Sequence, residues 1–404
     1  MISNRLDIRP QLGLRRIINV SGTMTALGAS IVVPDAVETV RGVLTEFVEI
    51  NDLHRRASEA IARATGAEAG CITASCSAGI TVAVAGCMTG ADIARIEQLP
   101  DATGMKDEVL IQAGHMVSYG APIEQAIRLA GARVVSVGQS TYARSYQLAG
   151  RLGDRTAAAV YVVSHHAVHY GQIELAEFCD VCHRRGVPVV VDAASEYDLR
   201  GFLGKGADLV AYSAHKFLGG PTAGIVAGRK ALVRAAFLQN HGIGRGMKVG
   251  KEGIAGTIAA LQAWEKRDHT AVRAEETRHL KLWLDRFAKV PGLRPGIVPD
   301  PTDNPLDRLR LEIVPAEAGT TAWALAASLA AGDPPIIVRD HEVEHGFVFL
   351  DPCNLHPGEA EIVAERVADV AKSIRGKLVP DLKELRRHQY EALLAWPDPL
   401  PADG

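Results

Sequence analysis

The stretch Ser213-Ala214-His215-Lys216-Phe217-Leu218-Gly219-Gly220-Pro221 places a lysine just before a glycine-rich turn. The apolar run ahead of it, Leu209–Tyr212, predicts a buried strand. Lysines normally occupy solvated faces, so a lysine at the end of such a strand is unusual. An amine withdrawn from water has a lowered pKa, which is what Schiff-base chemistry requires. The alternative interpretation is a surface turn with an incidental lysine.

A second apolar run ends in a carboxylate 24 residues before this lysine, in the stretch Val189-Val190-Val191-Asp192-Ala193-Ala194-Ser195-Glu196. Ligands of parallel α/β sheets bind at the carboxyl ends of the strands. An aspartate there can keep a pyridine nitrogen protonated, which makes the ring a stronger electron sink. An aspartate that only caps the next helix is the alternative. The spacing to Lys216, with one strand between, favours the functional interpretation.

A third segment consists mostly of small residues and precedes an apolar helix that is predicted to start at Thr81. It reads Thr73-Ala74-Ser75-Cys76-Ser77-Ala78-Gly79-Ile80. The exposed backbone N–H groups and the dipole of a helix start favour an anion, here a phosphate. Any helix can begin with serine, so the segment alone decides little. Other phosphate motifs fit less well, because Gly242–Gly246 lacks GxGxxG spacing and Gly250-Lys251 is followed by Glu252.

Short apolar runs alternate with helical stretches from Ala57 to Ala236, which predicts βαβ units and a mostly parallel sheet. A long helix over Ile254–Glu275 is expected to lead into a second domain that closes with a helix over Pro357–Ile374. The predicted strands are Val109–Ile111, Arg133–Val137, Ala158–Val163, Val187–Val191, Leu209–Tyr212, Gly224–Ala227, Asp307–Ile313, Pro335–Arg339 and Gly346–Leu350.

The 404 residues are 47% hydrophobic and 23% charged, with a net charge of −3. This balance favours neither a nucleic-acid nor a membrane surface as the main partner. No apolar run reaches the length needed to span a bilayer, and residues 1–16 lack the apolar core of a signal peptide. A cytoplasmic protein is therefore expected.

Cys179 and Cys182 form a CxxC pair followed by His183, which is compatible with metal or redox chemistry. However, the pair falls inside Ile173–Arg185, which reads as a helix, and no second ligand pair follows. We interpret both cysteines as small buried hydrophobes and predict no metal site.

Taken in order, these segments resemble the selenocysteine-synthase-like branch of fold-type-I pyridoxal-phosphate (PLP) enzymes, and within it the D-glucosaminate(-6-phosphate) ammonia-lyase-like group. The resemblance runs from about Ile17 to Ala263 and continues more faintly to about Ile374. It rests on Ile18–Thr23, Ser75–Gly79, Ala113–Met116, Val163–His166, Val191–Ala194, Ser213–Gly220 and Gly244–Glu252.

The resemblance implies an aspartate-aminotransferase-like α/β fold of type I, with a large mostly parallel-sheet domain and a smaller C-terminal α+β domain. The expected ranges are an N-terminal arm at 1–16, a PLP-binding domain at 17–265, a small domain at 266–375 and a tail at 376–404. Because sites of this fold usually lie at a dimer interface, a homodimer or higher homo-oligomer is also expected.

The resemblance also implies roles for single residues. Lys216 is the expected Schiff-base lysine, Asp192 the partner of the pyridine nitrogen, and His115 the side chain that stacks on the ring, unless it is only a structural histidine. His165, His166 and His169 crowd a strand end, and one of them, with His166 taken as catalytic, is expected to touch the cofactor hydroxyl or to donate a proton; His169 is equally well interpreted as a surface histidine. The implied cofactor-binding set is Ser75, Cys76, Ser77, Ala78, His115, Asp192, Ser195, Ser213, His215 and Lys216.

Substrate contacts are implied for Asn19, Thr23, Arg245, Lys248 and Arg339. Arg339 resembles the arginine that binds a substrate carboxylate, for which its fork geometry is suited. Arg245 and Lys248 share a basic, glycine-rich loop with Lys251 that reaches a neighbouring active site or, alternatively, is a solvated patch. The chain departs from its relatives at Cys76, where a small residue is expected, and at Gly246, where proline or alanine is usual.

The reaction implied is β-elimination from a β-hydroxy amino acid, for example a sugar amino acid such as D-glucosaminate, to give a 2-keto acid and ammonia. Racemisation, retro-aldol cleavage and transfer of a group to Cβ share its first step and stay open. Selenium transfer to seryl-tRNA is not expected, because the chain has no strongly basic arm. A non-catalytic protein that kept the fold is a further alternative, disfavoured by the intact lysine, aspartate and phosphate segment.

Overall fold

The computed structural model describes residues 7–378 and 381–398, and their contacts form two units. The large unit comprises Gly28–Arg267 with Pro301–Asn304. The smaller unit comprises the described residues of Met1–Leu27, Asp268–Asp300 and Pro305–Gly404. The segment before Gly28 thus goes with the C-terminal part of the chain; the domain ranges expected above stay a prediction.

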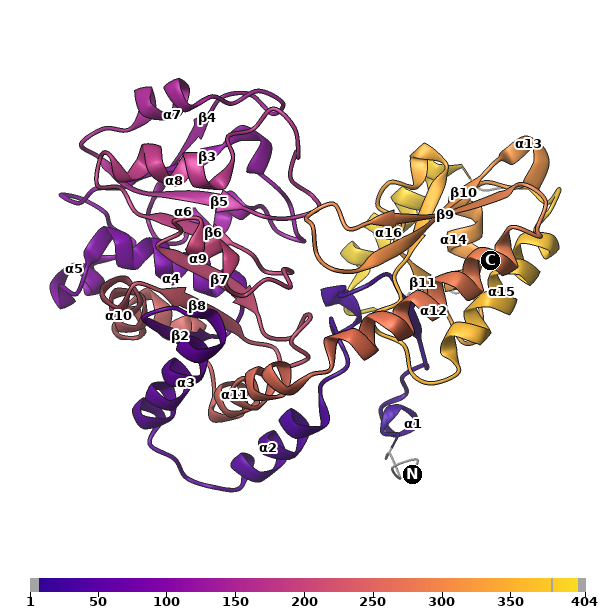
Figure 1. Cartoon of the computed structure of the whole chain (residues 1–404), viewed down its shortest axis with the longest axis horizontal. Helices are drawn as coiled ribbons and strands as arrows, with labels where there is room; N and C mark the ends of the chain where they lie inside the picture. Colours follow the sequence, from indigo (N-terminus) through magenta and orange to yellow (C-terminus); the bar gives the residue numbers. More distant parts are fainter. Residues whose placement is uncertain (1–6, 379–380, 399–404) are drawn as a thin grey trace. The chain divides into compact units, whose positions relative to one another are not determined.

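A seven-stranded sheet forms the centre of the large unit, in the order β2-β8-β7-β6-β5-β3-β4 (Figure 1). β8 pairs antiparallel with both of its neighbours and every other pairing between adjacent strands is parallel, as predicted. The strands are β2 (Ala69–Thr73), β3 (Glu108–Gln112), β4 (Arg133–Val137), β5 (Thr156–Val162), β6 (Val189–Asp192), β7 (Leu209–Ser213) and β8 (Gly224–Gly228).

Helices cover both faces of this sheet, which is why its central strands are apolar throughout rather than alternating. One face packs against α3 (Ile50–Thr65), α7 (Ser145–Arg151), α8 (Leu175–His183), α9 (Gly201–Gly204) and α11 (Lys251–Lys266). The other packs against α4 (Cys76–Thr89), α6 (Ile123–Arg128) and α10 (Lys230–Leu238). The remaining helices of the unit are α2 (Pro34–Leu44) and α5 (Ile93–Gln98).

Helix α4 is buried almost all round, because it crosses the sheet and contacts β5, β6, β7 and β8. Its sequence, CSAGITVAVAGCMT, has no charged residue, as expected of a helix without a solvent face. This crossing carries the first turn of α4 from the end of β2 toward the ends of β6 and β7.

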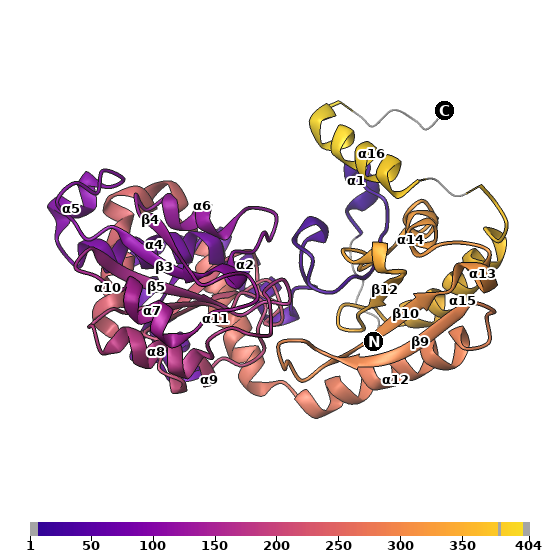
Figure 2. The ribbon, with the colours of Figure 1, turned by 90° about the horizontal axis from the view of Figure 1, so that it is seen from above.

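The smaller unit contains an antiparallel sheet in the order β12-β10-β9 and the parallel pair β1-β11. Helix α12 runs alongside β9 and β10 (Figure 2) and packs on α15, where Trp283 Nε1 donates to the Ala360 carbonyl oxygen at 2.9 Å. The elements are α1 (Arg9–Leu12), β1 (Ile18–Val20), α12 (His269–Phe287), β9 (Leu293–Pro299), β10 (Asp307–Ile313), α13 (Pro315–Ala318), α14 (Ala322–Ala330), β11 (Ile336–Val338), β12 (Phe347–Leu350), α15 (Glu359–Ser373) and α16 (Leu382–Ala395).

The single helix predicted over Ile254–Glu275 is wrong. Helix α11 ends at Lys266, Arg267 is extended (φ −65°, ψ 131°), and α12 begins at His269. Asp268 caps the second helix, its side chain accepting from the Ala271 N–H at 2.9 Å. An aspartate that satisfies a free N–H in this way favours a new helix start over a continuous helix.

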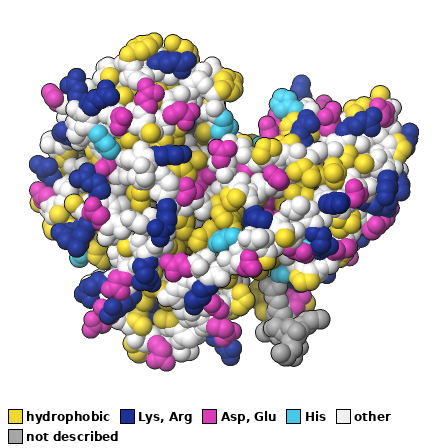
Figure 3. Space-filling model, in the orientation of Figure 1, with side chains coloured by type: hydrophobic (Ala, Val, Ile, Leu, Met, Phe, Trp, Pro, Cys, Tyr) yellow, Lys and Arg dark blue, Asp and Glu magenta, His cyan; other side chains and the backbone are white. Residues whose placement is uncertain are grey.

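Charged side chains of both signs are mixed over the face seen in Figure 3, in keeping with the net charge of −3. Among the described residues, no helix is long and apolar enough to cross a bilayer. Cys179 and Cys182 are buried in α8, where burial raises the pKa of each thiol to about 12.

Candidate active site

The predicted site residues of the large unit follow the carboxyl ends of its parallel strands. Cys76 comes after β2, His115 after β3, His166 after β5, Asp192 ends β6 and Lys216 follows β7. The carboxyl ends of parallel strands meet at one edge of a sheet, where α/β proteins bind ligands. This edge is therefore the candidate active site.

Asp192 is a buried carboxylate, only 5% exposed. Burial raises its pKa to about 6, against the lowering effects of the Ala194 N–H, the Cys76 thiol and the Lys216 charge. Oδ1 accepts from Ala194 N at 3.1 Å and lies 3.6 Å from Cys76 Sγ. The Lys216 charge also lowers the pKa of Cys76, so the three side chains share one site.

Lys216 is half-buried on a loop that is fixed from both sides. The Ser30 hydroxyl contacts the carbonyl oxygens of His215 and Lys216 at 2.6 and 2.8 Å, and Gly219 N donates to the Lys216 carbonyl at 2.9 Å. Gly219 has φ +67°, and a Cβ there would lie 2.9 Å from Val33 Cγ1, so the turn requires glycine.

The start of α4 has the geometry of an anion site. Ser75 caps the helix by accepting from Ala78 N at 3.1 Å, and Gly79 N donates to the Ser75 carbonyl. Within the described part of the chain, no hydrogen bond uses the amides of Cys76 and Ser77. Free amides at the positive end of a helix dipole are suited to a phosphate.

Tyr119 is a candidate site residue that the sequence did not indicate. Its hydroxyl lies 3.0 Å from Ser77 Oγ, at the start of α4. Burial raises the pKa of Tyr119, as do the nearby Asp192 and Cys76, while the Ser77 contact lowers it. Tyr119 lies in an irregular loop with no motif around it, so no local signal points to it.

His115 is buried between protein groups. Its Nδ1 accepts from Val162 N at 3.1 Å, and its ring meets Tyr161 edge-on at a centroid distance of 4.5 Å. Burial lowers the pKa of His115 to about 4, with a further contribution from His169. The ring is therefore neutral at pH 7 with its proton on Nε2; the predicted stacking role stays a prediction.

Ser213 and His215 flank the lysine loop and are both buried. The Ser213 hydroxyl lies against Cys76 and lowers the pKa of that thiol. Burial, followed by the Lys216 charge, lowers the pKa of His215, whose Nδ1 has no hydrogen-bond partner among the described residues. A buried nitrogen of this kind is what a polar ligand would satisfy.

Two more predicted residues of the large unit lie on loops nearby. His166 is exposed, and its ring lies 3.9 Å from that of His165 between centroids. Ser195 is partly buried, and its carbonyl accepts from Asn304 Nδ2 at 3.5 Å. The catalytic role of His166 and the cofactor role of Ser195 stay predictions.

The basic loop contributes two exposed side chains, Arg245 and Lys248. Lys251, by contrast, donates from Nζ to the carbonyl of Leu44 at 3.0 Å and to that of Glu46, so it closes the end of α2. The substrate role predicted for Arg245 and Lys248 stays a prediction.

The other predicted substrate residues, Asn19, Thr23 and Arg339, belong to the smaller unit. Asn19 Oδ1 accepts from the Ser21 amide and hydroxyl, and its Nδ2 donates to the Gly22 carbonyl at 2.8 Å. Arg339 is 8% exposed and donates from Nε to the Ser21 carbonyl at 3.1 Å. Their substrate roles also stay predictions.

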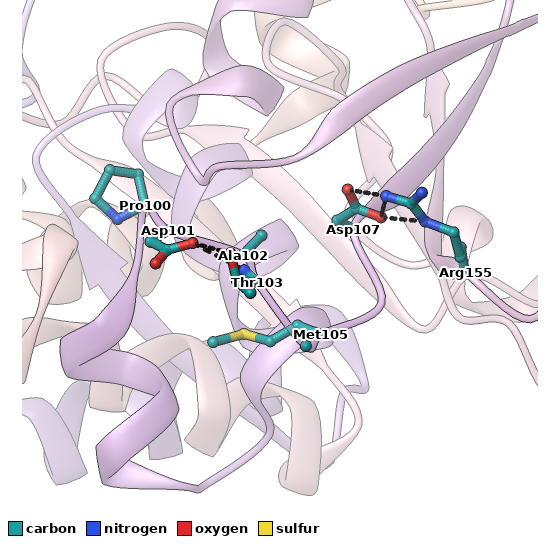
Figure 4. Close-up of a pocket in the computed structure, with 8 residues that line it drawn as sticks. Pro100, Asp101, Ala102, Thr103, Met105, Asp107 and Arg155 are labelled. Atoms are coloured by element: carbon teal, nitrogen blue, oxygen red, sulfur yellow. Dashed lines mark hydrogen bonds and ion pairs between the residues drawn. The ribbon is translucent and has the colours of Figure 1, made fainter.

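A pocket of about 560 Å³ lies at a different place, between Pro100 and Arg155 (Figure 4). Asp107 and Arg155 pair across it at 2.7 Å. Both residues precede the parallel strands β3 and β5, so this pocket lies at the amino ends of the strands, opposite the edge that holds Asp192 and Lys216.

Taken together, the groups at the carboxyl edge fit pyridoxal 5′-phosphate. They supply a lysine amine, a buried carboxylate whose Oδ2 takes none of the described hydrogen bonds, and two free amides at a helix start. The buried His215 Nδ1 is an additional unsatisfied polar atom. An aldehyde, a ring nitrogen and a phosphate are the groups that these three features would bind.

Comparison with known proteins is consistent with this geometry. The family described as "SelA: L-seryl-tRNA selenium transferase" matches residues 17–287. A D-glucosaminate-6-phosphate ammonia lyase of Salmonella typhimurium is 38% identical, with 91% of this chain and 98% of the relative covered. A 5′-C-glycyluridine monooxygenase-decarboxylase of Streptomyces sp is 36% identical, with 89% of this chain and 90% of the relative covered.

Solved structures agree on the fold. A D-glucosaminate-6-phosphate ammonia-lyase structure superposes with a TM-score of 0.82 at 37% identity, covering 91% of this chain and 98% of that one. A Thermus thermophilus aspartate aminotransferase superposes with a TM-score of 0.53 at 16% identity, covering 90% and 94%. The predicted aspartate-aminotransferase-like fold is therefore confirmed.

Proposed function

This chain belongs to the SelA family of L-seryl-tRNA selenium transferases, and on that premise we propose that it is a PLP-dependent ammonia-lyase. Its substrate would be a β-hydroxy amino acid, in particular a sugar amino acid such as D-glucosaminate or its 6-phosphate. The observation that carries the proposal is the placing of Lys216, Asp192 and the start of α4 at one edge of the sheet. The 38% identical ammonia lyase, matched along nearly its whole length, supports the choice of reaction.

The cofactor, when bound, supplies an electron sink that stabilises negative charge at Cα of the substrate. The amides of Cys76 and Ser77 would hold its phosphate, Asp192 its ring nitrogen and Lys216 its aldehyde carbon. Asp192 is suited to keep the ring nitrogen protonated, because a carboxylate with a pKa of about 6 is ionised at pH 7 and lies in a site closed to bulk water.

Lys216 Nζ would remove the proton from Cα of the bound amino acid and act as the general base. Departure of the Cβ hydroxyl as water then leaves an unsaturated amino acid, and its hydrolysis gives the 2-keto acid and ammonia. One water leaves and one water enters, so the net change is conversion of R–CHOH–CH(NH₃⁺)–COO⁻ into R–CH₂–CO–COO⁻ and NH₄⁺. The neutral His115 and the exposed His166 are candidates for carrying protons to the hydroxyl.

The test is to incubate the PLP-loaded protein with D-glucosaminate, its 6-phosphate, D-serine and L-serine, and to measure keto acid and ammonia. Keto acid and ammonia in equal amounts from a sugar amino acid support the proposal. If the PLP-loaded protein releases no ammonia from any of the four compounds, ammonia-lyase activity on these substrates is excluded.

The Streptomyces relative supports a second candidate, because its name denotes oxygen insertion with loss of carbon dioxide. Oxygen uptake and carbon dioxide release, without ammonia, would indicate that chemistry. Racemisation would appear as loss of optical activity without ammonia, and retro-aldol cleavage as release of an aldehyde. Following these quantities alongside keto acid and ammonia therefore separates the competing reactions.

The proposal includes a cytoplasmic homodimer or higher homo-oligomer that uses a small amino acid and neither nucleic acid nor membrane. Apolar side chains around α2, namely Val37, Leu44 and Phe47, are exposed in the single chain, as the face of an oligomer would be. Light scattering behind a size-exclusion column measures the assembly directly, and a monomer at micromolar concentration would contradict this part.

A further inference from the structure

We propose that Cys76 is a positioning residue whose thiol holds Oδ1 of Asp192 and so leaves Oδ2 for the ring nitrogen of the cofactor. The proposal deepens the proposed function and rests on it for the identity of the ligand. It also gives the thiol of Cys76 a role of its own, separate from the phosphate contact proposed for the Cys76 amide.

The two oxygens of Asp192 differ in their surroundings. Oδ1 receives the Ala194 N–H at 3.1 Å, and Cys76 Sγ lies 3.6 Å from the same atom, within the range of an S–H···O hydrogen bond. Oδ2 accepts none of the hydrogen bonds among the described residues. Two donors on one oxygen fix the rotation of the carboxylate and direct its other oxygen toward the ligand.

The thiol acts as the donor because it keeps its proton. Burial raises the pKa of Cys76 well above its ordinary value, and the negative Asp192 raises it further, while Lys216 and Ser213 act in the opposite direction. Cys76 and Asp192 are 5% exposed each, so bulk water does not compete for this contact. Ser213 lowers the pKa of the same thiol, so its side chain lies near Cys76.

The fold explains how a residue that follows β2 reaches the end of β6. Two strands, β8 and β7, separate them in the sheet. Helix α4 crosses the sheet and contacts both β6 and β7, so its first residue lies beside the Asp192 carboxylate. The simpler alternative, that Cys76 only fills space as a small buried hydrophobe, predicts that alanine would serve equally well.

Three variants separate the two interpretations: Cys76→Ala removes the donor, Cys76→Ser replaces it with a hydroxyl, and Cys71→Ala is the matched control. Cys71 is also buried and free, and burial alone raises the pKa of its thiol to about 12. PLP affinity is measured by fluorescence titration from pH 5 to 9, together with the pH dependence of the long-wavelength absorption band of the bound cofactor.

We expect Cys76→Ala to weaken PLP binding by about fivefold, the effect of one lost hydrogen bond from a weak thiol donor, and to shift the pH midpoint of binding upward. Cys76→Ser and Cys71→Ala should stay within twofold of the parent protein. A Cys76→Ala protein with the parent affinity and the parent midpoint would overturn the proposal.

A second measurement needs neither PLP nor activity. The infrared S–H stretching band of Cys76, identified as the band lost in Cys76→Ser, should lie at lower frequency than the band lost in Cys71→Ala. Equal frequencies would show that the thiol donates no hydrogen bond and would overturn the proposal even if Cys76→Ala did not fold. Failure of the parent protein to bind PLP would instead refute the proposed function and leave this infrared comparison valid.

Discussion

Two buried aspartates lie at the carboxyl ends of strands, one in each unit of the molecule, and their electrostatic surroundings differ. Asp351 follows β12 and pairs with Arg308 at 3.0 Å and with Arg339 at 3.7 Å, and Arg308 also pairs with Asp300. Burial raises the pKa of Asp351, but the two arginines outweigh it and the net shift is downward. At Asp192 burial prevails over Ala194, Cys76 and Lys216, and the pKa rises to about 6.

The difference separates a structural cluster from a binding site. In the smaller unit, Arg308 and Arg339 lie beside Asp351, and their charges more than compensate the burial of that carboxylate. The charge of Asp192 is buried without an equal compensation inside the protein. A buried group whose ionisation is left unfavourable is typical of a site that a ligand completes. Each prediction below tests one side of this contrast.

The largest expected effect is on activity, from Lys216→Ala. Removal of the amine should lower ammonia release by at least 10³-fold, because both the proposed attachment point and the proposed general base are lost. The long-wavelength absorption band of bound PLP should disappear as well. The control is Lys205→Ala, which changes an exposed lysine at the end of α9 and should leave the rate unaltered. A Lys216→Ala protein with a tenth of the parent rate would contradict the assignment.

On the structural side of the contrast, Asp351→Ala should destabilise the smaller unit by about 3–5 kcal/mol, because two buried arginines lose their shared partner. Urea unfolding followed by tryptophan fluorescence, to which Trp283 in the core of that unit contributes, measures the change. Glu317→Ala removes an exposed partner of Arg294 and should cost less than about 1 kcal/mol. Equal effects of the two substitutions would remove the distinction.

In the cofactor-free protein, Asp192→Asn should increase the free energy of unfolding, whereas Asp351→Ala should lower it. Because the folded pKa of Asp192 is raised, the parent protein carries a cost that is absent below about pH 4, grows between pH 4 and 6 and is complete above pH 6. The variant should therefore be more stable by up to roughly 3 kcal/mol at pH 7.5 and equal to the parent at pH 4. Urea unfolding at both pH values tests this, and a less stable variant at pH 7.5 would refute it. PLP should stabilise the parent more than the variant.

The smallest effect is expected from Tyr119→Phe, which removes the hydroxyl that contacts Ser77. Loss of this contact frees the Ser77 side chain at the proposed phosphate site, and one hydrogen bond of about 1 kcal/mol sets an upper limit of about fivefold on the weakening of PLP binding. Tyr390→Phe, on the exposed surface of α16, is the control. No change in PLP affinity in Tyr119→Phe would place this tyrosine outside the site.

Much of this edge could be predicted from the sequence, for a physical reason. A lysine and an aspartate that each end an apolar run interrupt the pattern of a buried strand, and parallel strands bring such ends together. The predicted strand limits of β4 and β10 agree with the structure residue for residue. The sequence of the crossing helix α4 also indicates that this helix is buried, because it contains no charged residue.

Other contacts could not be predicted, because they depend on the path of the chain between the strands. Ser30 reaches the Lys216 loop from 186 residues away, and Cys76 meets Asp192 only because α4 crosses the sheet. Tyr119 lies on an irregular loop without a periodic pattern. The break at Asp268 departs from the predicted single helix because one capping residue interrupts a helical pattern that continues on both sides.

The pairing of β1 with β11 has a consequence for the order in which the protein is built. Ile18 lies opposite Ile336 in this parallel pair, so a ribosome must add more than 300 residues before the first strand finds its neighbour. The large unit is contiguous apart from Pro301–Asn304, so nearly all of it can form once Arg267 has left the exit tunnel. Synthesis thus completes the sheet edge that holds Asp192 and Lys216 first, while the amino-terminal strand stays unpaired until the last third of the polypeptide is made.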